Sequence, residues 1–264
     1  MPLKSLGFSS DVLVMQGLSE FVEHGNYFTL RTRSEPDFWF GNMIIFKDDH
    51  VDLDTQFDLF KKEFPEVGHI TIGWDIPNMD QAGRFDDFKD RGLELELDDI
   101  LTLQRPLVRA LPPEGIELRQ LKSDDDFEQA TLLQIATGLE EGRSGDLYTS
   151  FARGRMTNRR KQIQDGWATW FGAFDGAELV GDLGIYADDR TARFQSIETR
   201  ASHRRRGICA SLVTAGVDWA ANRSPSATPV IAAEPDGDAG RIYRRCGFDV
   251  SERLIAVFRG PLGA

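Results

Sequence analysis

Three short apolar runs in the second half of the chain have the pattern of β-strands. They span Trp167–Phe174, Glu178–Tyr186 and Arg190–Thr199, with turn residues between them at Asp175-Gly176 and Asp188-Asp189. Runs rich in β-branched and aromatic residues between such turns are typical of strands, and an Asp-Gly pair between two runs favours a hairpin. We therefore predict an antiparallel meander.

Stretches on both sides of the meander predict helices and further strands. Ser123 is a good N-cap, and the acidic Asp124–Asp126 favour a helix start because they lie at the positive end of the helix dipole. Before the meander, the expected elements are a strand at Ile116–Arg119, a helix from Ser123 to about Leu139 and a helix from Asp146 to about Gln164. After it, they are a helix with the apolar stripe Leu212, Val213, Gly216, Val217 and Ala220, a strand at Pro229–Ala233, a helix at Asp238–Cys246 stopped by Gly247, and a strand at about Leu254–Arg259. This order predicts a mixed sheet with flanking helices, an α/β fold.

The first half of the chain repeats part of this order. The expected elements are a strand at Phe38–Lys47, a helix at Asp54–Phe64 with Phe57, Phe60 and Phe64 inward, a strand at His69–Trp74, a helix at Gln81–Arg91 and closing strand structure at Leu93–Gln104. The segment Pro77–Leu93 also resembles Pro235–Phe248, and the two share the sequence Ala-Gly-Arg. We infer a second, truncated copy of the same fold.

A proline-rich stretch, Arg105–Gly115, separates the two halves, because closely spaced prolines resist both helix and central strand. We therefore predict domains at residues 1–110 and 111–264. The net charge of the chain is −12, and residues 1–110 carry −10 of it. The acidity belongs almost entirely to the first domain.

Composition excludes several classes of protein. A chain this acidic is not expected to bind nucleic acid through the phosphate backbone. No apolar run approaches the roughly 18–20 residues that span a bilayer, so we expect a cytoplasmic protein without a membrane segment or signal peptide. Two cysteines are too few for a disulfide framework, and the four histidines are scattered, so no metal site is expected.

A basic turn at His203–Cys209 lies between a predicted strand and a predicted helix. In such a turn, backbone N–H groups and a helix N-terminus point toward one place, which suits a pyrophosphate. Gly207 lets the backbone approach a ligand, and Arg204–Arg206 add positive charge. The alternative is a solvated basic surface around an ordinary turn glycine. Neither the phosphate-binding loop of nucleoside triphosphatases nor the dinucleotide fingerprint is present.

Two motifs in this order resemble the GNAT superfamily of acyl-CoA-dependent N-acetyltransferases. The first is Arg204-x-x-Gly207-x-Cys209 after the strand that ends at Thr199, and the second is Tyr243 with the following Gly247-Phe248. The resemblance covers roughly residues 116–262 and implies tandem GNAT-like domains, the first truncated. Cys209 departs from the family pattern, which usually has Gly or Ala there. Because Cys is small, we expect tighter packing near the phosphates rather than loss of binding.

The resemblance implies acetyl-CoA as the acyl-donor co-substrate and assigns residues to it. Main-chain groups near Ile197 and Thr199 would bond the pantetheine arm, and N–H groups from about Arg205 to Ala210 would hold the pyrophosphate. Asp236 stands where the family often has Asn, and it takes over that role only weakly because an ionised Asp cannot donate. The implied cofactor-binding residues are Ile197, Thr199, Arg204, Arg205, Arg206, Gly207, Ile208, Cys209, Ala210 and Asp236.

Acyl transfer to an amine needs a base for the amine and an acid for the leaving thiolate. An amine that titrates near about 10.4 is mostly protonated at neutral pH, and a thiolate gains from a nearby proton donor such as a phenol. Tyr243 matches the family position for the acid, with a buried core aromatic as the alternative reading. The base candidates are Glu198 and Glu234, which lies at the end of the next strand. For Glu198 there are two alternatives, since strand alternation points it either toward the acetyl position or away from the face that Ile197 and Thr199 use.

The sequence of the first copy, residues 1–110, lacks the residues that would bind acyl-CoA and supply the acid. The turn that corresponds to the basic loop, Lys47–Asp54, carries four aspartates and no glycine, and these would repel a pyrophosphate. Asp86 falls where Tyr243 stands if the Ala-Gly-Arg motifs are aligned. We expect no acyl-CoA binding there. The copy either shields the active copy and attracts a cationic amine, or is a purely structural partner.

The leading interpretation is a cytoplasmic N-acyltransferase that moves an acetyl group from acetyl-CoA directly to a primary amine. The acceptor is expected to be a small molecule, and the protein a monomer or homodimer without metal, nucleic acid or membrane as partner. One alternative is a non-catalytic acyl-CoA-binding module. Another is an interaction protein whose acidic copy recruits a basic partner, in which case association would weaken steeply with salt.

Overall fold

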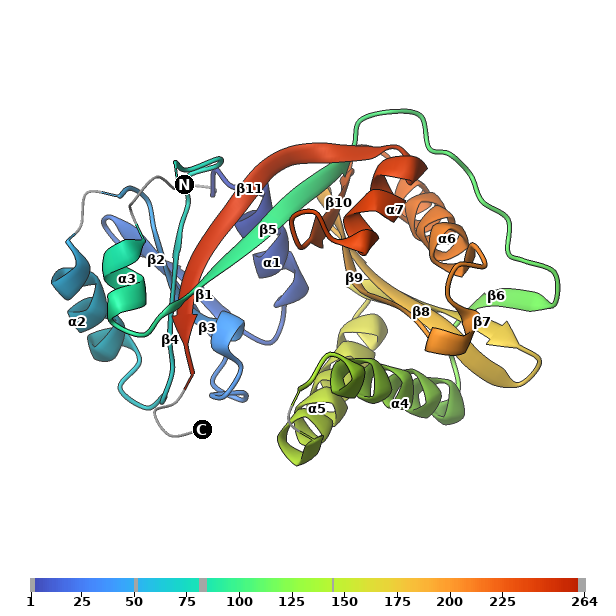
Figure 1. The fold of residues 1–264 in the computed structure, drawn as a ribbon, viewed down its shortest axis with the longest axis horizontal. Coiled ribbons are helices and arrows are strands. Elements are labelled where there is room, and N and C mark those ends of the chain that lie inside the picture. Colours follow the sequence, from blue (N-terminus) through green and yellow to red (C-terminus); the bar gives the residue numbers. More distant parts are fainter. Residues whose placement is uncertain (1–2, 50–51, 81–84, 144, 261–264) are drawn as a thin grey trace. The chain divides into compact units, whose positions relative to one another are not determined.

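The computed structural model describes residues 3–49, 52–80, 85–143 and 145–260 (Figure 1). The chain divides into two compact units. Unit 1 consists of Met1–Ile100, Ala232–Gly237 and Val250–Ala264, and unit 2 of Leu101–Ile231 and Asp238–Asp249. The predicted division into residues 1–110 and 111–264 is contiguous, whereas these units are not, because Ala232–Gly237 and most of the last strand group with unit 1.

Unit 1 is built from a mixed sheet, four short helices and a strand that it shares with unit 2. Its helices are α1 (Leu6–Val14), the 3-10 helix η1 (Trp39–Gly41), α2 (Leu53–Glu63) and α3 (Asp86–Asp90). Its strands are β1 (Glu20–Glu23), β2 (Tyr27–Arg31), β3 (Asn42–Phe46), β4 (Ile70–Trp74), most of β5 (Glu94–Leu103) and most of β11 (Phe248–Arg259). The strand order is β1-β2-β3-β4-β11-β5.

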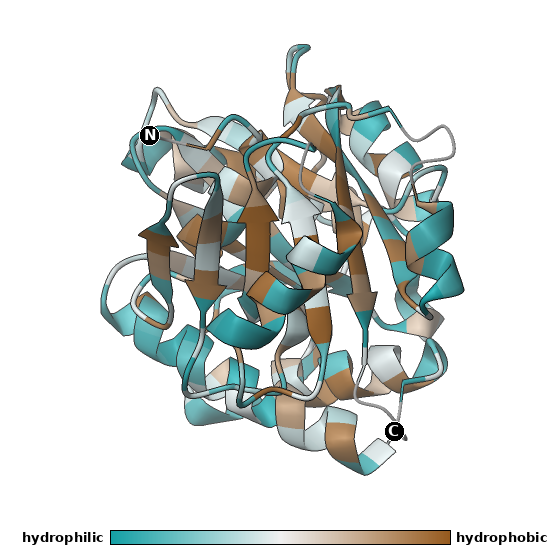
Figure 2. Cartoon of the chain, turned by 90° about the vertical axis from the view of Figure 1, so that its left-hand side faces the viewer, coloured by the Kyte–Doolittle hydropathy of each residue, from teal (hydrophilic) through white to brown (hydrophobic). Residues whose placement is uncertain are grey.

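Aromatic side chains fill the core of unit 1. Phe57, Phe60 and Phe64 are buried as the helical spacing predicts, and they pack with Trp74 and Phe88 in one hydrophobic cluster. β3 and β4, which α2 connects along the chain, pair directly and run parallel, whereas β2 and β3 are antiparallel. In Figure 2 the strands are mostly hydrophobic and the outward surfaces of the helices mostly hydrophilic.

Several boundaries in unit 1 differ from the prediction. The expected strand at residues 38–47 begins as the 3-10 helix η1 and becomes the strand β3 only at Asn42. The expected helix at residues 81–91 is the shorter α3, and the shared Ala-Gly-Arg of residues 82–84 lies outside the described residues. The elements α1, β1 and β2 were not predicted. The order β3, α2, β4, α3, β5 nevertheless matches the predicted order of strands and helices.

Unit 2 follows the predicted order throughout. Its first elements are β6 (Ile116–Gln120), α4 (Asp124–Glu140), α5 (Gly145–Gln164), β7 (Ala168–Asp175), β8 (Glu178–Ala187) and β9 (Thr191–Thr199). They are followed by the 3-10 helix η2 (Ala201–His203), α6 (Ile208–Arg223), β10 (Thr228–Ala233) and α7 (Asp238–Cys246). No helix in the described ranges is both long and apolar enough to cross a membrane.

The two faces of the unit 2 sheet carry different helices. Strands β7 to β9 form the predicted antiparallel meander, β6 pairs antiparallel to β7, and β10 pairs parallel to β9. Gln134 of α4 and Gln162 of α5 hydrogen-bond Asp182 and Tyr186, which point to the same face of β8. On the opposite face, α6 packs so closely that a Cβ on Gly216 would lie 2.5 Å from the ring of Phe194. The fold is thus a mixed α/β sheet with flanking helices.

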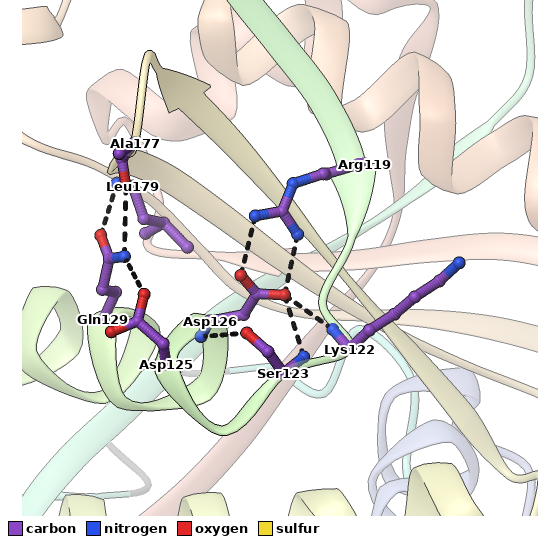
Figure 3. Close-up of polar contacts among 8 residues, drawn as sticks. All are labelled: Arg119, Lys122, Ser123, Asp125, Asp126, Gln129, Ala177 and Leu179. Carbon is purple, nitrogen blue, oxygen red and sulfur yellow. Dashed lines mark hydrogen bonds and ion pairs between the residues drawn. The ribbon is translucent and has the colours of Figure 1, made fainter.

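The start of α4 is fixed by a carboxylate that accepts four hydrogen bonds (Figure 3). Asp126 accepts two from the Arg119 guanidinium, at 2.7 and 2.8 Å, and two from the backbone N–H groups of Lys122 and Ser123. The Ser123 hydroxyl in turn accepts from the Asp126 N–H, which completes a capping box. Arg119 therefore joins β6 to α4, and its guanidinium also lies over the ring of Phe174 in β7.

A second contact anchors the same helix to the hairpin between β7 and β8 (Figure 3). The Gln129 side chain accepts a hydrogen bond from the Leu179 N–H at 2.8 Å and donates one to the Ala177 carbonyl at 3.2 Å. The Gln129 amide thus bonds main-chain groups of the hairpin in the way that a neighbouring strand would, and these bonds fix where α4 lies along the sheet. The later residues of α4 are thereby held over β8 and β9.

Replacement of Asp126 by Ala is expected to destabilise the protein by about 2 kcal/mol, through loss of the cap and of the Arg119 pair. The Arg119 guanidinium holds the pKa of Asp126 well below its usual range. The stabilisation is therefore complete above the unfolded pKa near about 3.9 and is lost as the pH falls below it. Urea unfolding of the wild type and of Asp126→Ala at pH 7 and pH 3 measures both effects.

Asp125→Ala is the matched control, because Asp125 is exposed in the same first turn and accepts a hydrogen bond from Gln129, one turn further along the helix. We expect a loss below about 0.5 kcal/mol. Equal losses in the two variants would contradict the role given to Asp126, since both remove one charge from the helix N-terminus.

Candidate functional site

The turn between β9 and α6 has the backbone of an anion-binding loop. Gly207, the N-cap of α6, has φ +89°, and Arg205 has φ +64°. A side chain at Gly207 would meet open space, so glycine is required there by the left-handed backbone rather than by crowding. No side chain caps the helix. The first N–H groups of α6 lack an intrahelical partner and sit at the positive end of its dipole.

The arginines of this turn are exposed, but one of them is engaged. The Arg204 guanidinium donates to the Thr199 carbonyl at 3.0 Å and to the carboxylate of Glu140, at the end of α4, at 2.7 Å. Arg205 and Arg206 are exposed beside Gly207. Ile208 is buried under the turn, whereas Cys209 and Ala210 are half-buried in the first turn of α6.

Tyr243 lies in a small cluster with the two cysteines. Burial raises the pKa of the Tyr243 hydroxyl far above its ordinary value, and the nearby Cys209 and Cys246 raise it further. Burial also raises the pKa of the Cys209 thiol to about 12, with a smaller contribution from Cys246. Both thiols are therefore neutral at physiological pH and are poor nucleophiles. Tyr243 remains a protonated phenol beside the N-terminus of α6.

Glu198 lies on the face of the sheet that α4 and α5 cover, because β9 contains a bulge. Gly184 of β8 pairs with Gln195, whereas Asp182 pairs with Glu198, so two residues of β9 oppose the single Leu183. One of these two, Ser196, has φ +47°. An extra residue shifts the alternation of side chains by one position. It places the Glu198 carboxylate on the same face as Asp182.

Ile197 and Thr199 use the other face. Thr199 pairs with Gly181, and a Cβ on Gly181 would lie 3.0 Å from Ile208 of α6. Of the two alternatives that strand alternation left for Glu198, the structure has the one in which it points away from the face of Ile197 and Thr199. The described part of the chain records no contact between Glu198 and Tyr243.

Polar and aromatic side chains surround the Glu198–Asp182 pair. The Trp170 indole N–H and the Gln134 amide both donate to Oδ2 of Asp182, at 2.8 and 3.0 Å. Arg159 of α5 donates to Gln134 at 2.6 Å and to Ser196 at 2.8 Å, and its guanidinium lies 4.7 Å from the Trp170 ring centroid. One network thus joins α4, α5, β7, β8 and the bulge of β9.

Burial is the main electrostatic influence on this carboxylate pair. It raises the pKa of Glu198, and the adjacent Asp182 raises it further, while the Thr137 hydroxyl and Arg159 act in the opposite direction. Burial raises the pKa of Asp182 as well, and its bonds from Trp170 and the Gln134 amide oppose that rise. Burial disfavours a charged carboxylate because the interior solvates it poorly.

Asp236 and Glu234 lie in the turn between β10 and α7. Both are exposed, and Asp236 has φ +61°. The Gly237 N–H bonds the Glu234 carbonyl at 3.2 Å, which closes the turn. These residues belong to unit 1, whereas the basic turn and Glu198 belong to unit 2. The roles predicted for the two acidic residues remain predictions.

The most informative residues of the site were not predicted. Asp182, Gln134, Trp170 and Arg159 become neighbours only through the packing of α4 and α5 on the sheet. One signal was present in sequence, since Asp182 is a single charge inside the apolar run Leu179–Ile185. A buried polar group in such a run needs partners. Within the described ranges, no three His, Cys, Asp or Glu side chains gather as a metal site requires.

The corresponding parts of unit 1 are different. In the acidic turn, Asp52 caps α2 by accepting from the Thr55 N–H, and residues 50–51 lie outside the described chain. Asp86 is exposed at the start of α3. Counted back from the glycines that follow α3 and α7, Gly92 and Gly247, the residue in the place of Tyr243 is instead the buried Phe88. Neither alignment places a phenol at the position in unit 1 that corresponds to Tyr243.

The raised pKa of Glu198 has a consequence for stability. A raised folded-state pKa gives stability that is present below the unfolded pKa, near about 4.3, and is lost as the pH rises through the folded value. Relative to Glu198→Gln, the wild type should therefore lose more than about 1.4 kcal/mol between pH 5 and pH 9, the equivalent of one pKa unit. Urea unfolding across this range measures it.

Glu178→Gln, an exposed carboxylate at the start of β8 that pairs with Arg200, is the control for that series. It should follow the wild type at every pH. A constant difference between the wild type and Glu198→Gln would contradict the raised pKa.

Comparison with known proteins agrees with this architecture. Residues 137–248 match the model of the acetyltransferase (GNAT) family. No curated protein matches at a significant level. A GCN5-related N-acetyltransferase from Kribbella flavida is 16% identical over 98% of both chains, with a TM-score of 0.62.

Two other solved structures share the fold. A functionally unknown conserved protein from Staphylococcus epidermidis ATCC 12228 is 12% identical over 91% of this chain and 93% of its own, with a TM-score of 0.68. A tandem GNAT protein from the clavulanic acid biosynthesis pathway is 15% identical over 78% of this chain and 68% of its own, with a TM-score of 0.53. At these identities the likeness concerns the fold, and the family follows from the matched segment: residues 137–248 form a domain of the GNAT acetyltransferase family.

Proposed function

We propose that this protein is an N-acetyltransferase that moves an acetyl group from acetyl-CoA to a primary amine. The observation that carries the proposal is the uncapped N-terminus of α6 behind the basic turn of Gly207, which follows the strand that holds the half-buried Glu198. Acyl transfer from a phosphorylated donor requires a site for the phosphates and a carboxylate whose pKa is raised toward neutral pH, and the two lie here on adjoining segments.

The donor would be held chiefly by backbone groups. The N–H groups at the start of α6, from Arg205 to Ala210, are suited to the pyrophosphate, with added charge from Arg205 and Arg206. Arg204 already bonds Glu140 and is the weaker contributor. Main-chain groups of Ile197 and Thr199 would bond the pantetheine arm. When bound, acetyl-CoA supplies the activated thioester.

Glu198 is the proposed base. Its raised pKa brings a carboxyl closer to neutral pH, where a group can both accept and release a proton. Glu198 would accept the proton of the amine, directly or through one water, as the amine nitrogen forms its bond to the acetyl carbon. The carboxylate must be ionised at that moment, so activity should rise as the pH passes through its pKa.

Tyr243 is the proposed acid. The bond between the acetyl carbon and sulfur breaks in the same reaction, and the Tyr243 hydroxyl would donate its proton to the departing thiolate. Its strongly raised pKa keeps the hydroxyl protonated across the physiological range. Neither Cys209 nor Cys246 is needed as a nucleophile, because the transfer is direct.

The acceptor is proposed to be a small molecule with a primary amine. Residues 1–110 would not bind acyl-CoA, because the turn before α2 is acidic and contains no glycine. With a net charge of −10, this part of the chain would instead favour the approach of a cationic amine.

Gly207→Glu is expected to abolish acetyl-CoA binding, since it places a carboxylate at the anion site and strains the left-handed backbone. Calorimetric titration with acetyl-CoA measures the loss. Gly166→Glu is the matched control, because Gly166 has a similar φ of +83° and open space around it, but follows α5 rather than preceding α6. Binding by both variants, or by neither, would contradict the assigned loop.

Tyr243→Phe is expected to lower kcat about 100-fold while leaving acetyl-CoA affinity within about twofold, because only the proton donor is removed. Thiol release against a panel of amines measures kcat, and calorimetry measures affinity. Turnover at the wild-type rate would exclude Tyr243 as the acid. Acetyl-CoA binding by the wild type without turnover of any amine would favour a non-catalytic binding module.

A further inference from the structure

Asp182 is a wholly buried carboxylate in the middle of a central strand. None of its surface is exposed, and its partner across β8 and β9 is Glu198. Side chains directly opposite each other in an antiparallel pair lie on the same face, with Cβ atoms about 5 Å apart. The bulge at Ser196 brings about this pairing, since a regular strand would place Ile197 opposite Asp182.

Each of the two carboxylates has one satisfied and one unsatisfied side. Oδ2 of Asp182 accepts from Trp170 and Gln134. Oδ1 of Asp182 and Oε2 of Glu198 are buried and have no hydrogen-bond partner among the described residues. Two such carboxylates cannot both be charged at low cost, because each is poorly solvated and they repel each other. Retaining one proton removes one of the two charges.

The surroundings decide where that proton resides. Asp182 receives two strong donors, and an ionised carboxylate is the better acceptor for both. Four groups face Glu198. They are the Thr137 hydroxyl in α4, Glu141 directly after α4, and Tyr148 and Arg159 in α5. Of these, only Thr137 donates a hydrogen bond to it, while the guanidinium of Arg159 donates to Gln134 and Ser196. The proton therefore favours Glu198.

We propose that Asp182 is the positioning residue of the base: Asp182 and Glu198 hold one proton between them, and the buried charge of Asp182 sets how readily Glu198 takes up and releases it. The part that concerns catalysis rests on the proposed function, in which Glu198 is the base. An amine that gives its proton to Glu198 gives it to a carboxylate made more basic by its neighbour. No further reactant is needed, since the proton only moves from nitrogen to oxygen.

The indole of Trp170 provides a direct reading of this pair that requires no substrate. Its N–H donates to Asp182, so its NMR chemical shift follows the protonation of that carboxylate. Trp170→Phe identifies the signal by its disappearance. In the wild type we expect the chemical shift of the indole N–H to change in two steps as the pH is varied. The step with the higher midpoint belongs to Glu198 and is small, and the step with the lower midpoint belongs to Asp182 and is large. In Glu198→Gln only the lower midpoint should remain.

A single midpoint that is the same in the wild type and in Glu198→Gln would overturn the proposal, because the two carboxylates would then titrate independently. This arm keeps Asp182 in place, so it does not depend on whether variants of the buried aspartate fold.

The second arm measures the dependence of kcat/KM on pH. Asp182→Asn keeps an oxygen for Trp170 and Gln134 but removes the charge. The midpoint of the acidic limb, where kcat/KM rises with pH, should therefore move to lower pH by at least about one unit. Glu178→Gln is the control for charge on the same strand, because Glu178 is exposed. In Glu178→Gln the midpoint of the acidic limb of kcat/KM should move by less than about 0.3 pH unit. A merely structural role for Asp182 would lower kcat without moving the limb.

The two arms separate the two proposals. If the indole shows two midpoints but no amine is acetylated, the carboxylate pair stands and the proposed function fails. If acetylation is found but the acidic limb of Asp182→Asn coincides with that of the wild type, the function stands and the inference about Asp182 fails.

Discussion

One extra residue in β9 decides which side chains can work together in unit 2. Because Ser196 and Ile197 both oppose Leu183, every residue after the bulge changes face relative to a regular strand. Without it, Glu198 would point toward α6 and Ile197 would cover Asp182. The left-handed backbone of Ser196 costs on the order of 1 kcal/mol, and the hydrogen bond from Arg159 offsets part of that cost.

The helices above the bulge are held in place by contacts far from it. Asp126 and Gln129 fix the start of α4, and the same helix then presents Gln134 and Thr137 to the carboxylate pair. Small residues permit the close packing that follows. A Cβ on Gly184 would lie 2.2 Å from the Trp170 ring, so only glycine there lets the indole reach Asp182. The site thus depends on hydrogen bonds at the start of α4 and on the absence of a side chain at Gly184 of β8.

Sequence patterns predicted what local signals encode. The meander, the cap of α4 and the turn of Gly207 each rest on residues within a few positions of one another, and the structure has all three elements. The bulge was beyond prediction, because Ser196 carries no signal that distinguishes it from a regular strand residue. Asp182 was visible as an isolated charge, but its pairing with Glu198 depends on register, which the bulge itself sets. In unit 1 the first helix and two strands lacked a strong period, and α3 proved shorter than its pattern.

The guanidinium of Arg204 belongs to two sites at once. It lies in the basic turn before α6, yet its ion pair is with Glu140 at the last residue of α4, the helix that carries Thr137. An anion that engaged Arg204 at the turn would have to share this arginine with Glu140 or release that carboxylate. Either event alters the charge at the end of α4. Binding of such an anion and the charge at the end of α4 would therefore be thermodynamically coupled, each affecting the other to the same extent.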